Sequence, residues 1–241
     1  MSSAPKVRKI IDPPKTDNKQ IHPNLPQPHA QVLMIMPCKC GKSTIGSNCL
    51  INSDFYGLDY FDIPPMVISN TINTDLTNRF LKKCCDVYDK YDDNIIHKFV
   101  EKQKSFGDVS QMPKACVFID DCLGDKTTAL DNLASRYRHS NIHLLMISTQ
   151  LFRKVSPTIR ANATNILIGR LQNSREIDKL DEEYGGMYDN KFIELYKQAT
   201  KKKYDFLHLN LQENPAEAWI NFETKIYPTN NEAPSEEIIE D

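Results

Sequence analysis

Apolar residues fall in short, nearly continuous runs, and longer mixed stretches separate these runs. Apolar runs without alternation are typical of strands that are covered on both faces, as in a parallel sheet. The predicted strands of this kind are 31–36 (QVLMIM), 66–70 (MVISN), 115–120 (ACVFID), 142–148 (IHLLMIS) and 165–169 (NILIG). The stretches between them are long enough for crossover helices, for example over 42–52 and 125–138. This order predicts an α/β domain with three layers.

The last part of the chain has a different pattern. Residues 204–209 (YDFLHL) and 218–222 (AWINF) alternate more strongly between apolar and polar positions, and Asn214-Pro215 lies between them. We therefore expect an antiparallel β-hairpin at one edge of the otherwise parallel sheet.

Both ends of the chain differ in composition from the middle. Residues 1–30 contain six prolines and predict a flexible or extended arm, because proline lacks an amide donor and has a fixed φ. Residues 229–241 form an acidic tail. The globular domain is expected over 31–228, which is close to neutral and so does not indicate a simple basic-patch DNA binder.

Composition indicates the kind of cellular compartment in which the protein is found. The seven cysteines are an odd number without zinc-site spacing, which favours a reducing compartment over a disulfide framework. The first residues lack the apolar segment of a signal peptide, and no apolar run is long enough to span a membrane. We therefore expect neither secretion nor a membrane span.

A phosphate-binding loop follows the first predicted strand. Residues 36–44 read MPCKCGKST and match the Walker A pattern G-x-x-x-x-G-K-[ST] except at Met36, where the pattern has glycine. Gly41 permits close approach of the backbone to a phosphate, and Lys42 can reach its outer oxygens. The Ser43 hydroxyl can bind Mg²⁺, and the helix that follows directs its positive end at the anion. The expected nucleotide-binding residues are Pro37, Cys38, Lys39, Cys40, Gly41, Lys42, Ser43 and Thr44.

A second acidic motif lies about 75 residues further on. The apolar strand 115–120 ends in Asp120 and Asp121, which is the Walker B arrangement. Two acids at the carboxyl end of a parallel strand project toward the crevice in which open α/β sheets bind ligands. Asp120 is the candidate magnesium ligand together with Ser43, and Asp121 is the candidate base that orients and deprotonates water.

The stretch after this motif is the most specific part of the sequence. Residues 138–162 contain an R-H-x-N-I strand that ends in Thr149-Gln150, followed by I-R-x-N. This run resembles the FtsK–HerA group of DNA-pumping P-loop ATPases. It is most similar to the branch of virion DNA-packaging ATPases found in poxviruses, other large DNA viruses and virophages. The resemblance covers about residues 31–222.

The resemblance implies a three-layer P-loop NTPase fold of the RecA-like (ASCE) type and an ATPase that uses ATP and Mg²⁺. It implies catalytic roles for Lys42, for Asp121, and for Gln150 as the polar sensor of the γ-phosphate. Arg138 is the leading candidate for an arginine finger that acts on a neighbouring subunit. Arg136 and Arg160 are the alternative candidates.

The resemblance also implies partners. We expect a homo-oligomeric ring that moves double-stranded DNA into a capsid without sequence preference, in the virion or the cytoplasm of the infected cell, with capsid or portal proteins as further partners. Lys201–Lys203 could face the DNA backbone in such a ring, although a solvated turn explains a lysine run as well. Two other functions remain open: a nucleoside or nucleotide kinase, and a nucleotide-binding switch or scaffold without turnover.

Overall fold

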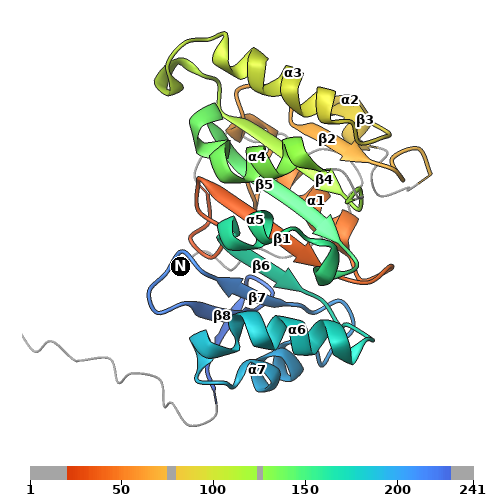
Figure 1. The fold of residues 1–241 in the computed structure, drawn as a ribbon, viewed down its shortest axis with the longest axis vertical. Coiled ribbons are helices and arrows are strands. Elements are labelled where there is room, and N and C mark those ends of the chain that lie inside the picture. The colour runs from red at the N-terminus through yellow and green to blue at the C-terminus, as the bar shows by residue number, and fades with distance from the viewer. Residues whose placement is uncertain (1–20, 75–79, 124–126, 229–241) are drawn as a thin grey trace, which may run out of the picture.

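The computed structural model describes residues 21–74, 80–123 and 127–228, and Figure 1 shows their arrangement. The strands are β1 (Ala30–Ile35), β2 (Met66–Ser69), β3 (Asp86–Tyr88), β4 (Ala115–Asp120), β5 (Ile142–Thr149), β6 (Asn165–Ile168), β7 (Leu207–Asn210), β8 (Glu217–Ile220) and β9 (Thr224–Ile226). The α-helices are α1 (Lys42–Ile51), α2 (Leu81–Cys84), α3 (Asp93–Lys104), α4 (Thr128–Arg136), α5 (Pro157–Asn162), α6 (Ser174–Tyr184) and α7 (Phe192–Ala199). The 3-10 helices are η1 (Leu58–Tyr60), η3 (Val109–Gln111), η4 (Tyr137–Ser140), η5 (Phe152–Lys154) and η6 (Gly185–Tyr188).

Within these described ranges, all nine strands belong to one sheet in the order β3-β2-β4-β5-β1-β6-β7-β8-β9. Strands β1 to β6 run parallel, whereas β7, β8 and β9 add an antiparallel extension beside β6. Strand β5 lies between β1 and β4. The strand before the phosphate loop and the strand that ends in the acidic motif are therefore separated by the strand that ends in Thr149.

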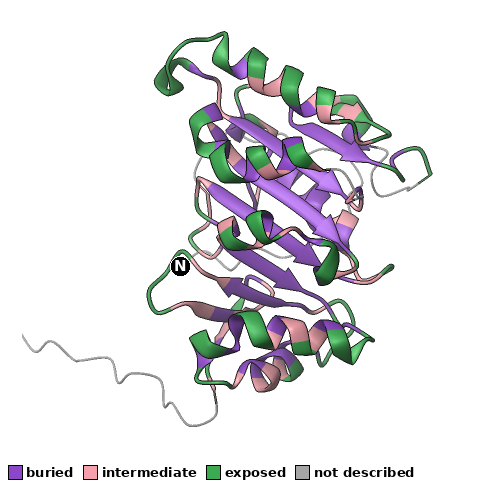
Figure 2. Ribbon diagram, viewed as in Figure 1, coloured by how far each residue is buried: buried purple, intermediate pink, exposed green. Residues whose placement is uncertain are grey.

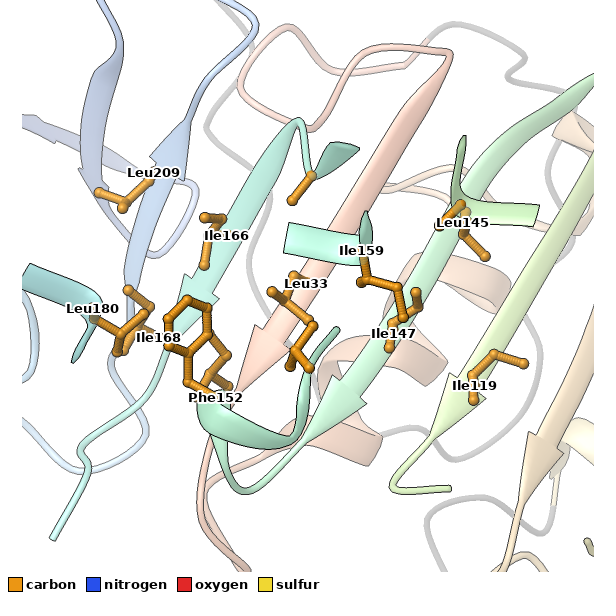
Figure 3. Close-up of a cluster of buried hydrophobic side chains, with 14 of the residues drawn as sticks. Leu33, Ile119, Leu145, Ile147, Phe152, Ile159, Ile166, Ile168, Leu180 and Leu209 are labelled. Atoms are coloured by element: carbon orange, nitrogen blue, oxygen red, sulfur yellow. The ribbon is translucent and has the colours of Figure 1, made fainter. Parts of the chain in front are cut away.

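The sheet separates two apolar cores, which makes the domain three layers deep. One core packs α3, α4, α5, α6 and α7 on one face of the sheet, and these helices lie in front of the sheet in Figure 1. Figure 3 shows part of this core, where Phe152 lies near Leu33 and Ile168. The second core covers the opposite face with α1, α2 and the aromatic segment 55–61.

Burial follows the unbroken apolar runs of the sequence. The central strands β1, β2, β4 and β6 are buried along their whole length, as the purple strands in Figure 2 show. Helix α3 buries only Ile96 and Gln103, so it covers the sheet with one narrow stripe. Among the described residues, no helix is both long and apolar enough to cross a membrane.

The expected fold class is confirmed, including the antiparallel pairing of β7 with β8 at the end of the parallel part. Some boundaries were wrong: Met36 lies just after β1, and Tyr204 precedes β7, because it lies in a left-handed turn with φ 74°. Strands β3 and β9 were not predicted. Each has only three residues, too few for a periodic signal.

The expected arm and tail lie largely outside the described residues. The acidic tail 229–241 and residues 1–20 of the arm fall there completely. The described part of the arm packs against the domain: Leu25 is 2% exposed, and the Tyr56 hydroxyl donates to the Pro26 carbonyl at 2.5 Å. Residue 30, expected to end the arm, is the first residue of β1.

Candidate functional site

The candidate site lies at the edge of the sheet where the parallel strands end. Because β1, β5, β4 and β2 are adjacent and parallel, the residues that follow them meet at one edge. The phosphate loop follows β1, Gln150 follows β5, and Asp121 follows β4. Parallel α/β sheets bind ligands at this edge.

The phosphate loop connects β1 to α1 through unusual backbone conformations. Gly41 has φ 98°, and a side chain there would be strained although it would meet no atom within 4 Å. Its carbonyl accepts the Ile45 amide at 2.8 Å, so helix α1 begins directly after the glycine. Lys39 also has a positive φ, 62°. Met36, at the position of the missing glycine, is fully buried and donates its amide to the Thr149 carbonyl at 3.0 Å.

Asp120 is a buried carboxylate that two hydroxyl groups hold in place. Ser148 donates to Oδ1 at 2.7 Å, and Ser69 donates to Oδ2 at 3.0 Å. Asp120 is 2% exposed, and this burial raises the pKa of its carboxyl group above the ordinary value. The two serine hydroxyls and the charge of Lys42 oppose that rise, while the neighbouring Asp121 adds to it.

Three side chains meet at the mouth of the site. The amide of Gln150 donates to Asp121 Oδ2 at 2.6 Å, and Lys42 Nζ lies 3.7 Å from the same oxygen. Lys42 Nζ also donates to the Met36 carbonyl at 2.8 Å. Asp121 has φ 54°, a left-handed conformation that ends β4 and turns the chain away from the sheet. The structure therefore brings together Lys42, Asp120, Asp121 and Gln150.

Three of these groups, Lys42, Asp120 and Asp121, border a cleft of about 430 Å³. The cleft is lined by Pro37, Cys38, Lys39, Gly41, Lys42, Ser43, Thr44, Thr71, Thr74, Asp120 and Asp121. The predicted loop residues thus line one cleft with both acids, except Cys40, which lines a neighbouring hollow. The cleft combines backbone amides at a helix start, a cation and two carboxylates, which suits a polyphosphate with a bound metal ion.

Arg138 and Arg136 lie at the opposite edge of the sheet, and Arg160 does not line the cleft. Arg138 is in η4, directly before β5, and its guanidinium group lies 5.6 Å from the Tyr137 ring centroid. Strand β5 spans eight residues, so Arg138 and Gln150 are separated by roughly 25 Å at about 3.3 Å per residue. Arg136 ends α4 at the same distant edge. Arg160 pairs with Glu183 and lies 5.0 Å from the Phe152 ring centroid, so contacts within the fold already hold it.

Sequence reasoning missed several residues of the site. Ser69 and Ser148 fix Asp120, and Thr71 and Thr74 line the cleft. A signal for the serines was present, because each lies at the carboxyl end of a predicted apolar strand. Their use as donors to one aspartate depends on the order β2-β4-β5, which the sequence does not state.

Sequence comparison finds only distant relatives. No protein-family model matches the chain. The chain is 29% identical over 153 residues to the uncharacterised protein 075L of Invertebrate iridescent virus 6, covering 61% of this chain and 58% of that protein. It is 25% identical over 177 residues to the uncharacterised protein 088R of Invertebrate iridescent virus 3, covering 70% and 67%. The match thus spans less than two thirds of the first relative.

Comparison of folds is more informative. The chain is similar to B204, the DNA-packaging ATPase of Sulfolobus turreted icosahedral virus, with a TM-score of 0.59 and 19% identity over 80% of this chain and 97% of that one. The genome-packaging NTPase B204 of Sulfolobus turreted icosahedral virus 2, in complex with AMP, gives a TM-score of 0.58 with 19% identity, covering 80% and 96%. The pCW3 conjugation coupling protein TcpA with ATPγS gives 0.53 with 15% identity, covering 75% and 57%.

These likenesses concern the fold, because the identities are all below 25%. The resemblance to viral packaging ATPases seen in the sequence is confirmed at the level of the fold. The chain has the P-loop NTPase fold that the packaging ATPase B204 also has.

Proposed function

We propose that this protein is an ATPase that uses ATP and Mg²⁺ to move double-stranded DNA into a viral capsid. The observation that carries the proposal is the meeting of Lys42, Asp121 and Gln150 within hydrogen-bonding or ion-pair distance beside the buried Asp120. A hydrolase needs a cation for the phosphates, an acid for the metal ion and a group that orients water, and this edge of the sheet supplies all three.

The donor set fits a magnesium ion. Among the described residues, no group of three or more histidine, cysteine or acidic side chains gathers as a complete metal cage. Mg²⁺ is commonly held by one or two carboxylates together with substrate phosphates and water, so Asp120 and the Ser43 hydroxyl suffice. The cost of burying the Asp120 carboxylate also favours a bound cation there. When bound, Mg²⁺ would neutralise charge on the phosphate oxygens.

The chain's own residues divide the remaining work. The backbone of the loop 37–44 and the start of α1 would hold the phosphates, and Lys42 would contact the terminal one. Asp121 would accept a proton from the attacking water, and the Gln150 amide, which donates to that carboxylate, would orient both groups. Asp121 is one methylene shorter than glutamate, so the water must lie close to the end of β4.

DNA transport and assembly rest on the relatives. B204 is described as a DNA-packaging ATPase and TcpA as a conjugation coupling protein, and the two sequence relatives are encoded by iridescent viruses. We infer a homo-oligomeric ring that acts on DNA without sequence preference in the virion or the infected cell. Capsid or portal proteins are further partners in this proposal.

Arg138 completes the proposal as a residue that acts on a neighbour. It lies at the opposite edge of the sheet from its own phosphate loop, so it can reach a nucleotide only in another subunit. There it would neutralise charge that develops on the transferred phosphoryl group.

The test is ATP hydrolysis by the purified protein with and without linear double-stranded DNA. We expect DNA to raise turnover, and Lys42→Ala and Asp121→Asn each to lower it on the order of 10²-fold or more. Lys104→Ala and Asp108→Asn, both exposed and away from the cleft, are matched controls that should leave turnover unchanged. Turnover indifferent to DNA, or phosphate transfer to a nucleoside, would contradict the motor and favour a kinase. Nucleotide binding without turnover would favour a switch.

A further inference from the structure

A second hollow lies beside the phosphate loop. It has a volume of about 400 Å³, and the residues that line it include Lys39, Arg170, Lys202, Lys203, Tyr204 and Asp205. Lys39 also lines the phosphate cleft, so the two cavities meet at the loop. A ligand whose phosphates occupy the cleft can therefore place its other end in this hollow.

The wall that carries Arg170 is held firmly. The Leu171 amide donates to the Tyr196 hydroxyl at 2.7 Å, and the same hydroxyl donates to the Gly169 carbonyl at 3.4 Å. Arg170 itself is exposed between these two anchored residues. Tyr196 belongs to α7, so the helix fixes the segment that follows β6 and leaves the guanidinium group available to a ligand.

The opposite wall is the turn between α7 and β7. The Asp205 amide donates to the Lys202 carbonyl at 3.4 Å, and Asp205 Oδ1 accepts the Asn221 side-chain amide at 3.1 Å. Asn221 Oδ1 in turn accepts the Phe206 amide at 3.1 Å. Asp205, the acid in the lining, is therefore already hydrogen-bonded. Asn221 follows β8, so these bonds link the turn to the antiparallel extension.

Tyr204 presents an aromatic ring at this wall. Its side chain is 58% exposed, and its φ of 74° is strained for a bulky residue. Lys203 Nζ lies 4.7 Å from the centre of its ring. Strain that a fold retains at an exposed aromatic residue is a reason to look for a ligand, because packing does not require it.

The charges of the hollow indicate the kind of ligand. Lys39, Arg170, Lys202 and Lys203 bring four cations, and Asp205 is the one acid in the lining. A planar ring next to excess positive charge suits a molecule with an aromatic base and anionic phosphates. A nucleoside triphosphate has both features, in the order that the hollow and the cleft provide.

We propose that this hollow binds the nucleoside end of the nucleotide, with Tyr204 as the stacking surface for the base and Arg170 as a polar contact. This inference rests on the proposed function, because it takes the phosphates to lie in the cleft. Lys202 and Lys203 are then part of the nucleotide site rather than DNA contacts. The antiparallel extension, through the turn before β7, becomes part of ATP binding.

The experiment measures the affinities of two ligands by calorimetry in the presence of Mg²⁺: the non-hydrolysable nucleotide AMPPCP and inorganic tripolyphosphate. Tyr204→Asn removes the ring and suits the left-handed backbone. We expect it to weaken AMPPCP binding about tenfold and leave tripolyphosphate binding unchanged, since only AMPPCP carries a base that can stack on the ring. Arg170→Ala should act in the same direction, and Tyr204→Phe should keep the affinity of the wild type.

Tyr227 offers a matched control. It is 38% exposed and has Lys225 Nζ 5.6 Å from its ring centre, so it repeats the lysine–tyrosine pair outside the hollow. Tyr227→Asn should leave both affinities unchanged. Lys42→Ala should weaken both ligands, because it acts on the phosphates.

The two failures can be distinguished. If the wild type binds neither ligand, the proposed function fails. If the wild type binds both and Tyr204→Asn and Arg170→Ala bind AMPPCP as tightly as it does, this inference alone is overturned. A loss of affinity for linear double-stranded DNA in Lys202→Ala and Lys203→Ala, with AMPPCP affinity retained by all four variants, would assign the hollow to DNA instead.

Discussion

The side chain of Met36 fills the space beside Gly169, where a Cβ atom would lie 2.9 Å from Met36 Cγ and 3.1 Å from Met36 Cβ. Phosphate loops usually have glycine at the position of Met36. Here the glycine lies on the neighbouring chain segment, just after β6, and the Gly169 amide donates to the Ile35 carbonyl at 3.0 Å. The position without a side chain is therefore Gly169 instead of residue 36, so β1 can continue into the phosphate loop without distortion.

Gly169→Ala should therefore destabilise the protein by about 1–3 kcal/mol, the usual cost of an overpacked core. The atoms that the new methyl group meets are close to the Met36 backbone and cannot swing away. Thermal unfolding should show a lower Tm for Gly169→Ala and partial recovery in Met36→Ala/Gly169→Ala. Gly186→Ala is the control, because a Cβ atom there meets nothing within 4 Å. Equal Tm values for the two alanine variants would contradict the packing account.

Asp120→Asn should separate metal binding from folding. The buried carboxylate is costly to ionise in the folded protein, and asparagine keeps its shape without its charge. Without Mg²⁺ and nucleotide, we expect the Tm at pH 7 to stay the same or rise. Addition of Mg²⁺ with AMPPCP should raise the Tm of the wild type and leave that of the variant nearly unchanged. An equal rise in both proteins would remove Asp120 from the metal site.

Arg138→Ala should abolish most turnover while leaving AMPPCP affinity largely unchanged, because the proposed arginine finger acts on charge that develops on the transferred phosphoryl group. Mixing Arg138→Ala subunits with Asp121→Asn subunits should restore activity. In a random equal mixture, about a quarter of the interfaces join an intact acid to an intact arginine. The readout is ATPase rate after mixing, and Arg136→Ala is the control. Absence of recovery, with each variant still assembled, would contradict action across the interface.

Cys38 reports on occupancy of the cleft. It is exposed and lines the cleft, whereas Cys84 and Cys85 are half-buried beside α2. We expect Mg²⁺ with AMPPCP to slow alkylation of Cys38 by N-ethylmaleimide several-fold, because a bound nucleotide covers the thiol. Peptide mass spectrometry measures the rate at each cysteine. The Cys84–Cys85 peptide is the internal standard, and a Cys38 rate unaffected by nucleotide would place the phosphates elsewhere.

Acid should destabilise the fold through two histidines. Burial lowers the pKa of His208 to about 3, and burial together with His29 and Lys114 lowers the pKa of His143 to about 4. In the unfolded chain histidine titrates near 6.5, so below that pH the unfolded state binds protons that the folded state refuses. The stability that these two neutral histidines contribute is fully present above pH 6.5, and it is lost as the pH falls toward about 4 for His143 and about 3 for His208.

For the fully buried His208, the loss between pH 6.5 and pH 5 is about 2 kcal/mol. His208→Gln should lower the Tm at pH 7, because the ring nitrogen Nε2 lies 2.8 Å from Asn165 Oδ1. It should also reduce the fall in Tm between pH 7 and pH 5. Thermal unfolding at the two pH values is the measurement, and a fall as large as that of the wild type would assign the acid sensitivity to other groups.

The sequence predicted the parallel part of the sheet because its strands are buried on both faces and appear as unbroken apolar runs. It predicted Lys42, Asp120 and Asp121 because each follows such a run at a defined spacing. Contacts between neighbouring strands could not be predicted from the sequence. The bond from Gln150 to Asp121 depends on the adjacency of β5 and β4, and the second hollow depends on the turn before β7 lying beside the phosphate loop.

The placement of Arg138 could have been derived. A residue directly before a strand parallel to β1 must lie at the edge opposite to the phosphate loop, whatever the strand order. Tyr204 could not have been found in this way, because its left-handed φ has no local signal such as glycine or asparagine.

Strand β5 carries a consequence for assembly. It runs from the edge with Arg138 to the edge with Gln150, so in the proposed ring a copy that donates its arginine at one edge receives its neighbour's arginine at the other. Contacts of this kind join unlike surfaces and have no two-fold axis, so two copies cannot satisfy each other. In an open row of copies, one nucleotide site lacks its neighbour's arginine until the last copy contacts the first. Turnover per chain should then fall steeply on dilution, because every open arc contains a site without its arginine.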